Sequence, residues 1–158
     1  MQGHFDHIIF VEMIVAVGHE YLQGFFDRCE SILKPGGNLV FQVITLPDLE
    51  YDRYRKNCDS IQKFISPGAC VPSFQILKQK ACNKSGFKME SAEDIRLHYA
   101  ETLKVWRETF IKNWTKIKGF GCGEYFYNMW NCYMHYYEAG FCNRYLRTYQ
   151  LKFAKEPV

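Results

Sequence analysis

The sequence predicts an α/β fold with two parallel strands, a terminal antiparallel hairpin and aromatic-rich helical insertions. Two mostly apolar runs, residues 7–11 and 38–44, indicate the parallel strands, because strands buried on both faces carry such runs. The amphipathic segment between them is long enough for the crossover that joins parallel strands. Near the C-terminus, two aromatic segments with helical spacing precede a last alternating stretch, residues 145–154.

The first strand is expected to stop at Glu12, and a loop then leads to a helix that begins at His19. This helix runs over residues 21–34, and its apolar face comprises Leu22, Phe25, Phe26, Cys29, Ile32 and Leu33. A Pro-Gly-Gly sequence ends it and turns the chain. Ligands of open α/β sheets bind where parallel strands end, so residues 5–20 are the first place to look for a functional site.

The second half of the chain is expected to be richer in turns and helices. Residues 48–65 have a helical pattern, and after a rigid loop Ser73 is the expected N-cap of a helix that reaches Asn83. A strand is predicted over residues 87–94. A helix then carries Tyr99, Thr102, Leu103, Trp106 and Phe110, and a further helix is predicted over residues 124–139. Such a sheet has an open edge, so the whole chain is predicted to be one domain that is the C-terminal portion of something larger.

The composition argues against several classes of function. The chain has 158 residues, of which 47% are hydrophobic, unlike a disordered protein. A net charge of +3 is too small to indicate nucleic-acid binding, and no apolar run approaches the roughly 20 residues of a membrane span. The five histidines and seven cysteines lack metal-binding spacing, and unpaired thiols without a signal peptide indicate a cytoplasmic protein. The glycines of residues 119–123 follow no strand and are interpreted as a helix–helix connection.

Several short motifs, taken in order, resemble one enzyme family. They include Phe5-Asp6-His7-Ile8-Ile9, Val11-Glu12-Met13-Ile14, Val17-Gly18-His19-Glu20-Tyr21, Leu33-Lys34-Pro35-Gly36-Gly37, His98-Tyr99-Ala100 and Glu138-Ala139-Gly140-Phe141. Over nearly the whole chain the sequence is similar to the S-adenosylmethionine-dependent cyclopropane-fatty-acyl-phospholipid synthases, which include the mycolic acid cyclopropane synthases. The resemblance implies strands four to seven of a class I, Rossmann-like methyltransferase sheet. The N-terminal cofactor-binding half of that domain would be absent from these residues.

The resemblance also implies a reaction and its participants. In this family S-adenosylmethionine donates a methyl group to the cis double bond of an acyl chain, and a bound bicarbonate removes a proton so that the ring closes. The implied cofactors are therefore S-adenosylmethionine and bicarbonate. The implied partners are phospholipid acyl chains at a membrane surface, and a homodimer is left open. A cytoplasmic protein peripheral to the membrane is expected.

Five residues match the family's site directly or closely. Tyr99 matches the bicarbonate-binding tyrosine, and Gln42 stands where bacterial members often carry a bicarbonate-binding histidine. A glutamine can still donate a hydrogen bond there. Val11 and Ile44 match positions whose backbone lies at the cofactor and bicarbonate, and Glu12 is assigned with them to the cofactor.

Two further positions depart from the family pattern. Val15 occupies the place of a bicarbonate-holding glutamate, although valine can neither donate nor accept a hydrogen bond. Tyr137 occupies the place of a cysteine. Two hypotheses of different classes follow. The first is a cyclopropane synthase-like methyltransferase of which this chain alone is inactive. The second is a non-catalytic relative that binds acyl chains or a partner subunit.

Overall fold

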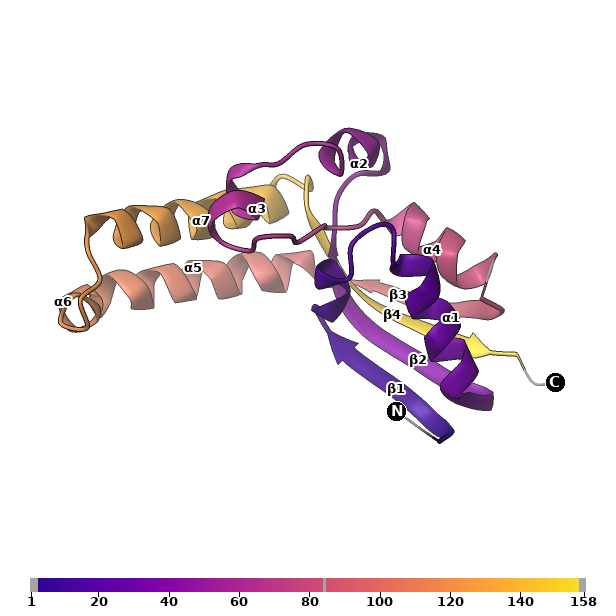
Figure 1. Cartoon of the computed structure of the whole chain (residues 1–158). Coiled ribbons are helices and arrows are strands. Elements are labelled where there is room, and N and C mark those ends of the chain that lie inside the picture. The colour runs from indigo at the N-terminus through magenta and orange to yellow at the C-terminus, as the bar shows by residue number, and fades with distance from the viewer. Residues whose placement is uncertain (1–2, 84, 157–158) are drawn as a thin grey trace.

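The computed structural model of the chain describes residues 3–83 and 85–156, and Figure 1 shows a four-stranded sheet from which a pair of long helices projects. The elements in chain order are β1 (Phe5–Val11), the 3-10 helix η1 (Met13–Ala16), α1 (Leu22–Ile32), β2 (Leu33–Thr45), α2 (Asp48–Tyr54), α3 (Ser60–Phe64), α4 (Phe74–Cys82), β3 (Phe87–Asp94), α5 (Arg96–Lys112), α6 (Trp114–Lys118), α7 (Glu124–Cys142) and β4 (Arg147–Lys155). The sheet order is β1-β2-β4-β3, with β1 parallel to β2 and β4 antiparallel to both of its neighbours. The predicted α/β fold, with two parallel strands and a terminal antiparallel pair, is confirmed.

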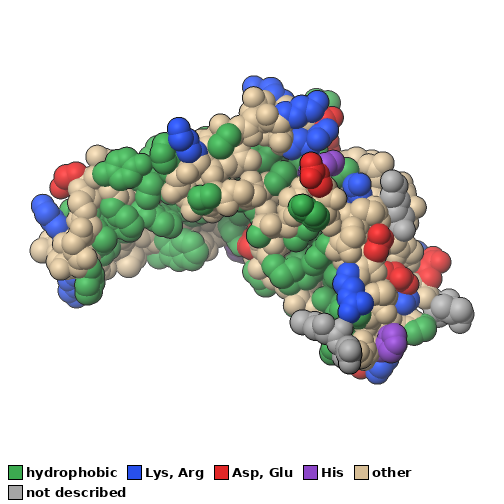
Figure 2. All heavy atoms as spheres, in the orientation of Figure 1, with side chains coloured by type: hydrophobic (Ala, Val, Ile, Leu, Met, Phe, Trp, Pro, Cys, Tyr) green, Lys and Arg blue, Asp and Glu red, His purple; other side chains and the backbone are tan. Residues whose placement is uncertain are grey.

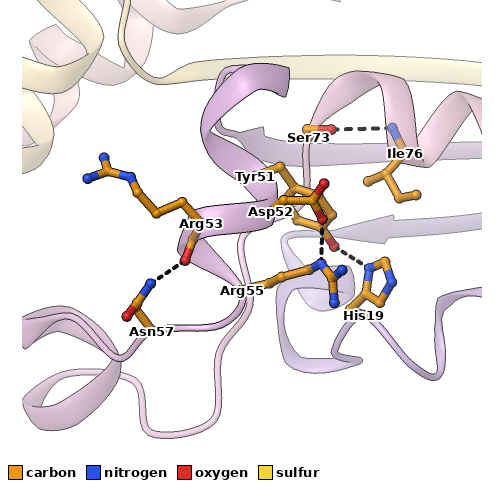
Figure 3. Close-up of polar contacts among 8 residues, drawn as sticks. All are labelled: His19, Tyr51, Asp52, Arg53, Arg55, Asn57, Ser73 and Ile76. Carbon is orange, nitrogen blue, oxygen red and sulfur yellow. Dashed lines mark hydrogen bonds and ion pairs between the residues drawn. The ribbon is translucent and has the colours of Figure 1, made fainter.

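Several predicted boundaries are confirmed as well. β3 spans the predicted residues 87–94. At the start of α4 the Ser73 Oγ accepts a hydrogen bond from the Ile76 N–H at 3.3 Å, as expected of an N-cap (Figure 3). The glycine-rich residues 119–123 connect α6 to α7. These local signals act within a few residues, so the sequence alone is enough to place them.

Several boundaries were predicted wrongly. The helix expected to reach residue 34 ends at Ile32, and β2 begins at Leu33, so the Pro-Gly-Gly sequence lies inside the strand. α1 begins at Leu22 rather than His19, because Gly18 has a left-handed backbone (φ 78°) and a turn follows it. Residues 48–65 form two short helices rather than one, since α3 has a start of its own at Asp59. The Asp59 carboxylate and the side chain three residues later form a reciprocal capping box, which favours a new helix over a continued one.

One face of the sheet is packed under α1 and α4 (Figure 1). Three phenylalanine rings stack across neighbouring strands on this face: Phe10 on Phe41 at 4.7 Å and Phe41 on Phe153 at 5.6 Å between ring centroids. Phe26 of α1 lies over the middle ring at 6.1 Å. The rings of Phe26, Phe41 and Phe153 are fully buried, so this stack is the centre of the core that joins α1 to β1, β2 and β4.

The opposite face of β1 is open, which corrects one expectation. The apolar run predicted a strand covered on both faces, but Ile9 and Val11 are 71% and 63% exposed. Ile8 and Phe10 point the other way and pack on the core. β1 is also an edge strand, since within the described residues it pairs only with β2. The apolar residues are buried on one face only, because α1 and α4 cover that face and no described helix packs on the other.

The helices α5 and α7 run side by side as an arm that leaves the sheet, with α6 at its tip (Figure 1). A second hydrophobic cluster fills the space between them, and an ion pair between Arg107 and Glu138 at 3.0 Å links the two helices. Figure 2 shows hydrophobic side chains gathered along this arm. Among the described residues, none of the helices is long and apolar enough to span a membrane.

We expect Phe41→Ala to lower the free energy of unfolding by about 3–5 kcal/mol, because removal of the ring leaves a cavity inside the stack. Urea denaturation followed by circular dichroism measures this change. Leu49→Ala is the matched control, since Leu49 is 97% exposed, and should alter stability by less than about 0.5 kcal/mol. Equal losses in the two variants would contradict the assigned core.

Candidate functional site

The parallel ladder between β1 and β2 ends at Glu12 in an unusual way. The Glu12 N–H donates to the Gln42 carbonyl at 2.9 Å. In a regular parallel ladder the Ile44 N–H would next bond to the Glu12 carbonyl. Instead the Glu12 backbone is left-handed (φ 57°, ψ 3°), and its side-chain Oε2 accepts the Ile44 N–H at 3.0 Å. A left-handed residue other than glycine costs about 1–2 kcal/mol, and such residues cluster at functional sites.

The second carboxylate oxygen of Glu12 faces two side chains from distant elements. The Tyr99 Oη, near the start of α5, donates to Glu12 Oε1 at 2.8 Å. The Gln42 Nε2 of β2 lies 2.6 Å from Tyr99 Oη and 3.3 Å from Glu12 Oε1 and donates to both. Residues 87 positions apart along the chain therefore meet where the parallel strands end. Four of the predicted site residues, Glu12, Gln42, Ile44 and Tyr99, form one hydrogen-bonded group.

The electrostatics of this group keep Tyr99 a hydrogen-bond donor. Burial and the nearby Glu12 carboxylate raise the pKa of the Tyr99 phenol above its ordinary value of 10.0. Burial and, to a lesser extent, the Glu12 charge also raise the pKa of the Tyr133 phenol of α7. A carboxylate held by protonated donors can carry a negative charge in a half-buried site and can accept a proton.

The structure places Val11 beside this group, whereas the Val15 side chain packs against both hydrophobic clusters. Val11 pairs with Gln42 in the β1–β2 register, so its backbone lies next to the polar group while its side chain is exposed. Val15 is partly buried between the two hydrophobic clusters. Its carbonyl accepts a hydrogen bond from the Cys70 N–H at 2.8 Å. The Val15 side chain therefore serves packing here.

Tyr137 belongs to an aromatic run rather than to the hydrogen-bonded group. Successive ring centroids lie 4.9–6.1 Å apart in the order Tyr99, Phe141, Tyr137, Tyr133, Trp130 and Phe126. The run leads from the polar group along α7 into the arm. Aromatic faces stabilise a nearby cation, so this wall suits a reaction in which positive charge develops.

An apolar hollow lies between α3 and α7, beside the aromatic run. Its volume is about 270 Å³, and Ile61, Phe64, Met129 and Tyr133 are among the residues that line it. Tyr133 also belongs to the aromatic run through its ring contact with Tyr137, so one end of the hollow adjoins that run. A hollow of this kind fits a segment of hydrocarbon chain.

A separate polar cluster fixes α2 over the turn that precedes α1 (Figure 3). The His19 Nδ1 lies 2.8 Å from the Tyr51 Oη, and Arg55 Nε donates to Asp52 at 2.8 Å. Burial, the largest cause, lowers the pKa of His19, and Arg55 adds to this effect. A neutral histidine bonded to a buried tyrosine fits a structural role in holding α2 and the His19 turn together.

Sequence reasoning missed two residues of the site. The Gln150 Nε2 of β4 donates to Gln42 Oε1 at 3.2 Å and so fixes which way the Gln42 amide points. Tyr133 of α7 is linked to Tyr99 through the rings of Tyr137 and Phe141. The alternating pattern of the last strand predicts on which face of the sheet Gln150 lies. Its pairing with Gln42 depends on the register between β2 and β4, which local sequence patterns do not predict. Among the residues that the structure describes, no cluster of His, Cys, Asp and Glu could hold a metal ion.

We expect Tyr99→Phe to lower the free energy of unfolding near neutral pH by about 1–2 kcal/mol, because Glu12 loses a donor in a half-buried site. The raised Tyr99 pKa adds a pH dependence. Above pH 10.0 the unfolded chain releases this proton first, so stability falls as pH rises toward the folded pKa. The phenylalanine variant lacks this contribution. The difference in free energy of unfolding between the variant and the natural chain should therefore shrink above pH 10.0.

Chemical denaturation at a series of pH values measures both effects. Tyr125→Phe is the control, since Tyr125 is 69% exposed and its loss should leave the pH profile unchanged. A Tyr99 variant with the stability and pH profile of this control would show that the hydrogen bond contributes nothing.

Known proteins that are similar to this chain share its fold. The family described as mycolic acid cyclopropane synthetase matches residues 1–151. The tuberculostearic acid methyltransferase UfaA1 of Mycobacterium tuberculosis is 36% identical over 156 residues, which are 99% of this chain and 36% of that protein. Two solved structures, the cyclopropane synthase MmaA2 of Mycobacterium tuberculosis and the mycolic acid cyclopropane synthase CmaA1 complexed with SAH and CTAB, each superpose with a TM-score of 0.86 at 22% identity. They cover 98% of this chain and 57% of the other. The chain thus spans only part of its relatives, and it belongs to the mycolic acid cyclopropane synthetase family.

Proposed function

We propose that the chain is the C-terminal portion of an S-adenosylmethionine-dependent methyltransferase that modifies the cis double bond of an unsaturated acyl chain in a phospholipid. The observation that carries this proposal is the group formed by Glu12, Gln42 and Tyr99 at the carboxyl ends of the parallel strands. An aromatic wall and an apolar hollow adjoin it. UfaA1 is named as a methyltransferase and MmaA2 as a cyclopropane synthase, so the likeness supports methyl transfer to lipid with either a ring or a methyl branch as product.

The end of β1 fits one side of a cofactor site. Val11 and Met13 are 63% and 47% exposed beside Glu12, so the strand end is accessible. Val11 at the end of β1, Glu12 directly after it and Ile44 of β2 would hold S-adenosylmethionine, which supplies an electrophilic methyl group when bound. We assign the other side of this site to a cofactor-binding half that pairs with the open edge of β1. The exposed Ile9 on this strand supports such a partner.

Bicarbonate fits the residues present poorly. Its implied ligands include Tyr99 and Gln42, and both already donate to the Glu12 carboxylate. The Ile44 N–H is also taken by Glu12. A tyrosine has one O–H to donate and a backbone amide has one N–H, so a second anion would find these donors occupied. We therefore assign no step to bicarbonate.

The chain's own residues would position the acyl chain and shield the reaction. The hollow beside Met129 would hold a stretch of hydrocarbon, and the rings near Tyr99 would exclude water and face the developing positive charge. The arm carries exposed hydrophobic side chains, including Val105, Trp106 and Phe120 (Figure 2). These side chains support contact with a membrane surface from the water side, as expected of a peripheral protein.

Reconstitution with a cofactor-binding half tests the proposed activity. The chain is fused to the N-terminal part of UfaA1 that precedes the matched region, and incubated with methyl-labelled S-adenosylmethionine and vesicles of a cis-monounsaturated phospholipid. We expect label in the acyl chain, detected by mass spectrometry as a gain of one carbon. The 158-residue chain alone should give none, because half of the cofactor site is missing.

The fusion with Tyr99→Phe is the matched loss-of-function variant, and Tyr21→Phe, at a 70% exposed site outside the hollow, is its control. A folded fusion that binds the methyl donor but transfers no methyl group to any unsaturated lipid would contradict the proposed function. Hydrolysis releases the modified fatty acid, and gas chromatography with mass spectrometry of that acid distinguishes a cyclopropane from a methyl branch.

A second candidate function, non-catalytic binding of acyl chains, is favoured by the hollow itself. We expect Met129→Trp to weaken binding of a fluorescent fatty acid about tenfold, because the larger ring fills space for about two methylene groups. Fluorescence titration of the chain alone measures this. Leu49→Trp adds the same ring at a 97% exposed site outside the hollow and the arm, and should bind like the natural chain. Equal affinities for all three would exclude the hollow as a lipid site.

A further inference from the structure

The Glu12 carboxylate occupies a built anion position. Three donors converge on it: the Ile44 N–H on Oε2 at 3.0 Å, and the Tyr99 O–H and Gln42 amide on Oε1 at 2.8 Å and 3.3 Å. The donors come from two elements, β2 and α5, that are far apart in sequence. Gln150 in turn fixes the Gln42 amide at 3.2 Å. A small anion with two oxygens would use the same donors in the same way.

The Glu12 carboxylate reaches this position only through an unfavourable backbone conformation. The left-handed backbone of Glu12 ends the ladder and turns its side chain back onto the amide of Ile44. A backbone carbonyl would have satisfied that amide without strain. Val15, three residues later, offers no carboxylate and is packed between the hydrophobic clusters. Glu12 is therefore the carboxylate from this turn that reaches Tyr99.

The geometry points to Glu12 as a tethered anion that replaces a bound bicarbonate and acts as the proton acceptor of the site. This role rests on the proposed methyl transfer. When the methyl group joins one carbon of the double bond, the other carbon becomes a cation. One methyl C–H proton then moves to the Glu12 carboxylate, and the electron pair of that C–H bond closes the three-membered ring. The methyl donor leaves as a neutral thioether, so charge and atoms balance.

Binding of bicarbonate to the 158-residue chain tests the anion position without any turnover. The backbone amide of Ile44 is followed by ¹⁵N nuclear magnetic resonance while ¹³C-bicarbonate is added. The natural chain should show no saturable shift, because Glu12 holds the donors. Glu12→Gly suits the left-handed backbone and empties the position, so the Ile44 signal should shift saturably. Adding Tyr99→Phe should weaken that binding about tenfold.

Two further variants distinguish specific binding of bicarbonate in place of the Glu12 carboxylate from a general effect of removing a negative charge. Glu108→Ala removes an exposed carboxylate of α5 and should bind no bicarbonate. Glu12→Asn, which also tolerates a left-handed backbone, should bind bicarbonate if Glu12→Gly fails to fold. Saturable binding by the natural chain would overturn the inference, as would a folded Glu12→Gly or Glu12→Asn variant that binds none.

The fusion enzyme tests the proton-acceptor role separately. Turnover of the natural fusion should be unchanged when carbon dioxide is removed from the buffer. In the same buffer, turnover should be lost in Glu12→Gly and partly restored by added bicarbonate or formate. An enzyme that needs bicarbonate while Glu12 is present would contradict the role. The bicarbonate-binding experiment does not depend on turnover by the fusion enzyme. A fusion that transfers no methyl group is therefore distinguishable from a Glu12 variant that binds no bicarbonate.

Discussion

The end of β1 beside a longer β2 is the constraint on which the site depends. β2 continues past the last backbone pair, so its Ile44 amide needs a new acceptor. Glu12 supplies one from its side chain, and the same carboxylate draws Tyr99 of α5 to the sheet. One hydrogen-bond requirement at a strand end thus joins the first strand, the central strand and the helical arm.

The two hydrophobic clusters meet around this point. The phenylalanine stack lies under α1, while the second cluster fills the arm between α5 and α7. Val15 packs against both of them. A position that serves packing between two clusters suits a β-branched apolar residue better than a charged one. The arm is therefore held in place by packing on one side of the strand end and by the Tyr99 hydrogen bonds on the other.

The aromatic residues of α7 have two roles in this arrangement. Phe141 is fully buried and contacts the ring of Tyr99, so it helps position the phenol that reaches Glu12. Further out, Tyr133 and Trp130 continue the same run beside the hollow. The aromatic stripe of α7, which the sequence pattern alone indicates as core, thus forms one continuous wall from the polar group into the arm.

The sequence by itself determined the α/β class, the N-cap at Ser73, the span of β3 and the family, because these depend on local patterns and motifs. It also singled out Tyr99, Gln42, Ile44 and Glu12, which the structure brings together in one hydrogen-bonded group. Only the tertiary structure decided that Glu12 bonds to Tyr99 and Ile44 and that Val15 packs against both hydrophobic clusters. Those contacts depend on a left-handed residue at a strand end and on strand register and helix placement over tens of residues, which local sequence patterns do not encode.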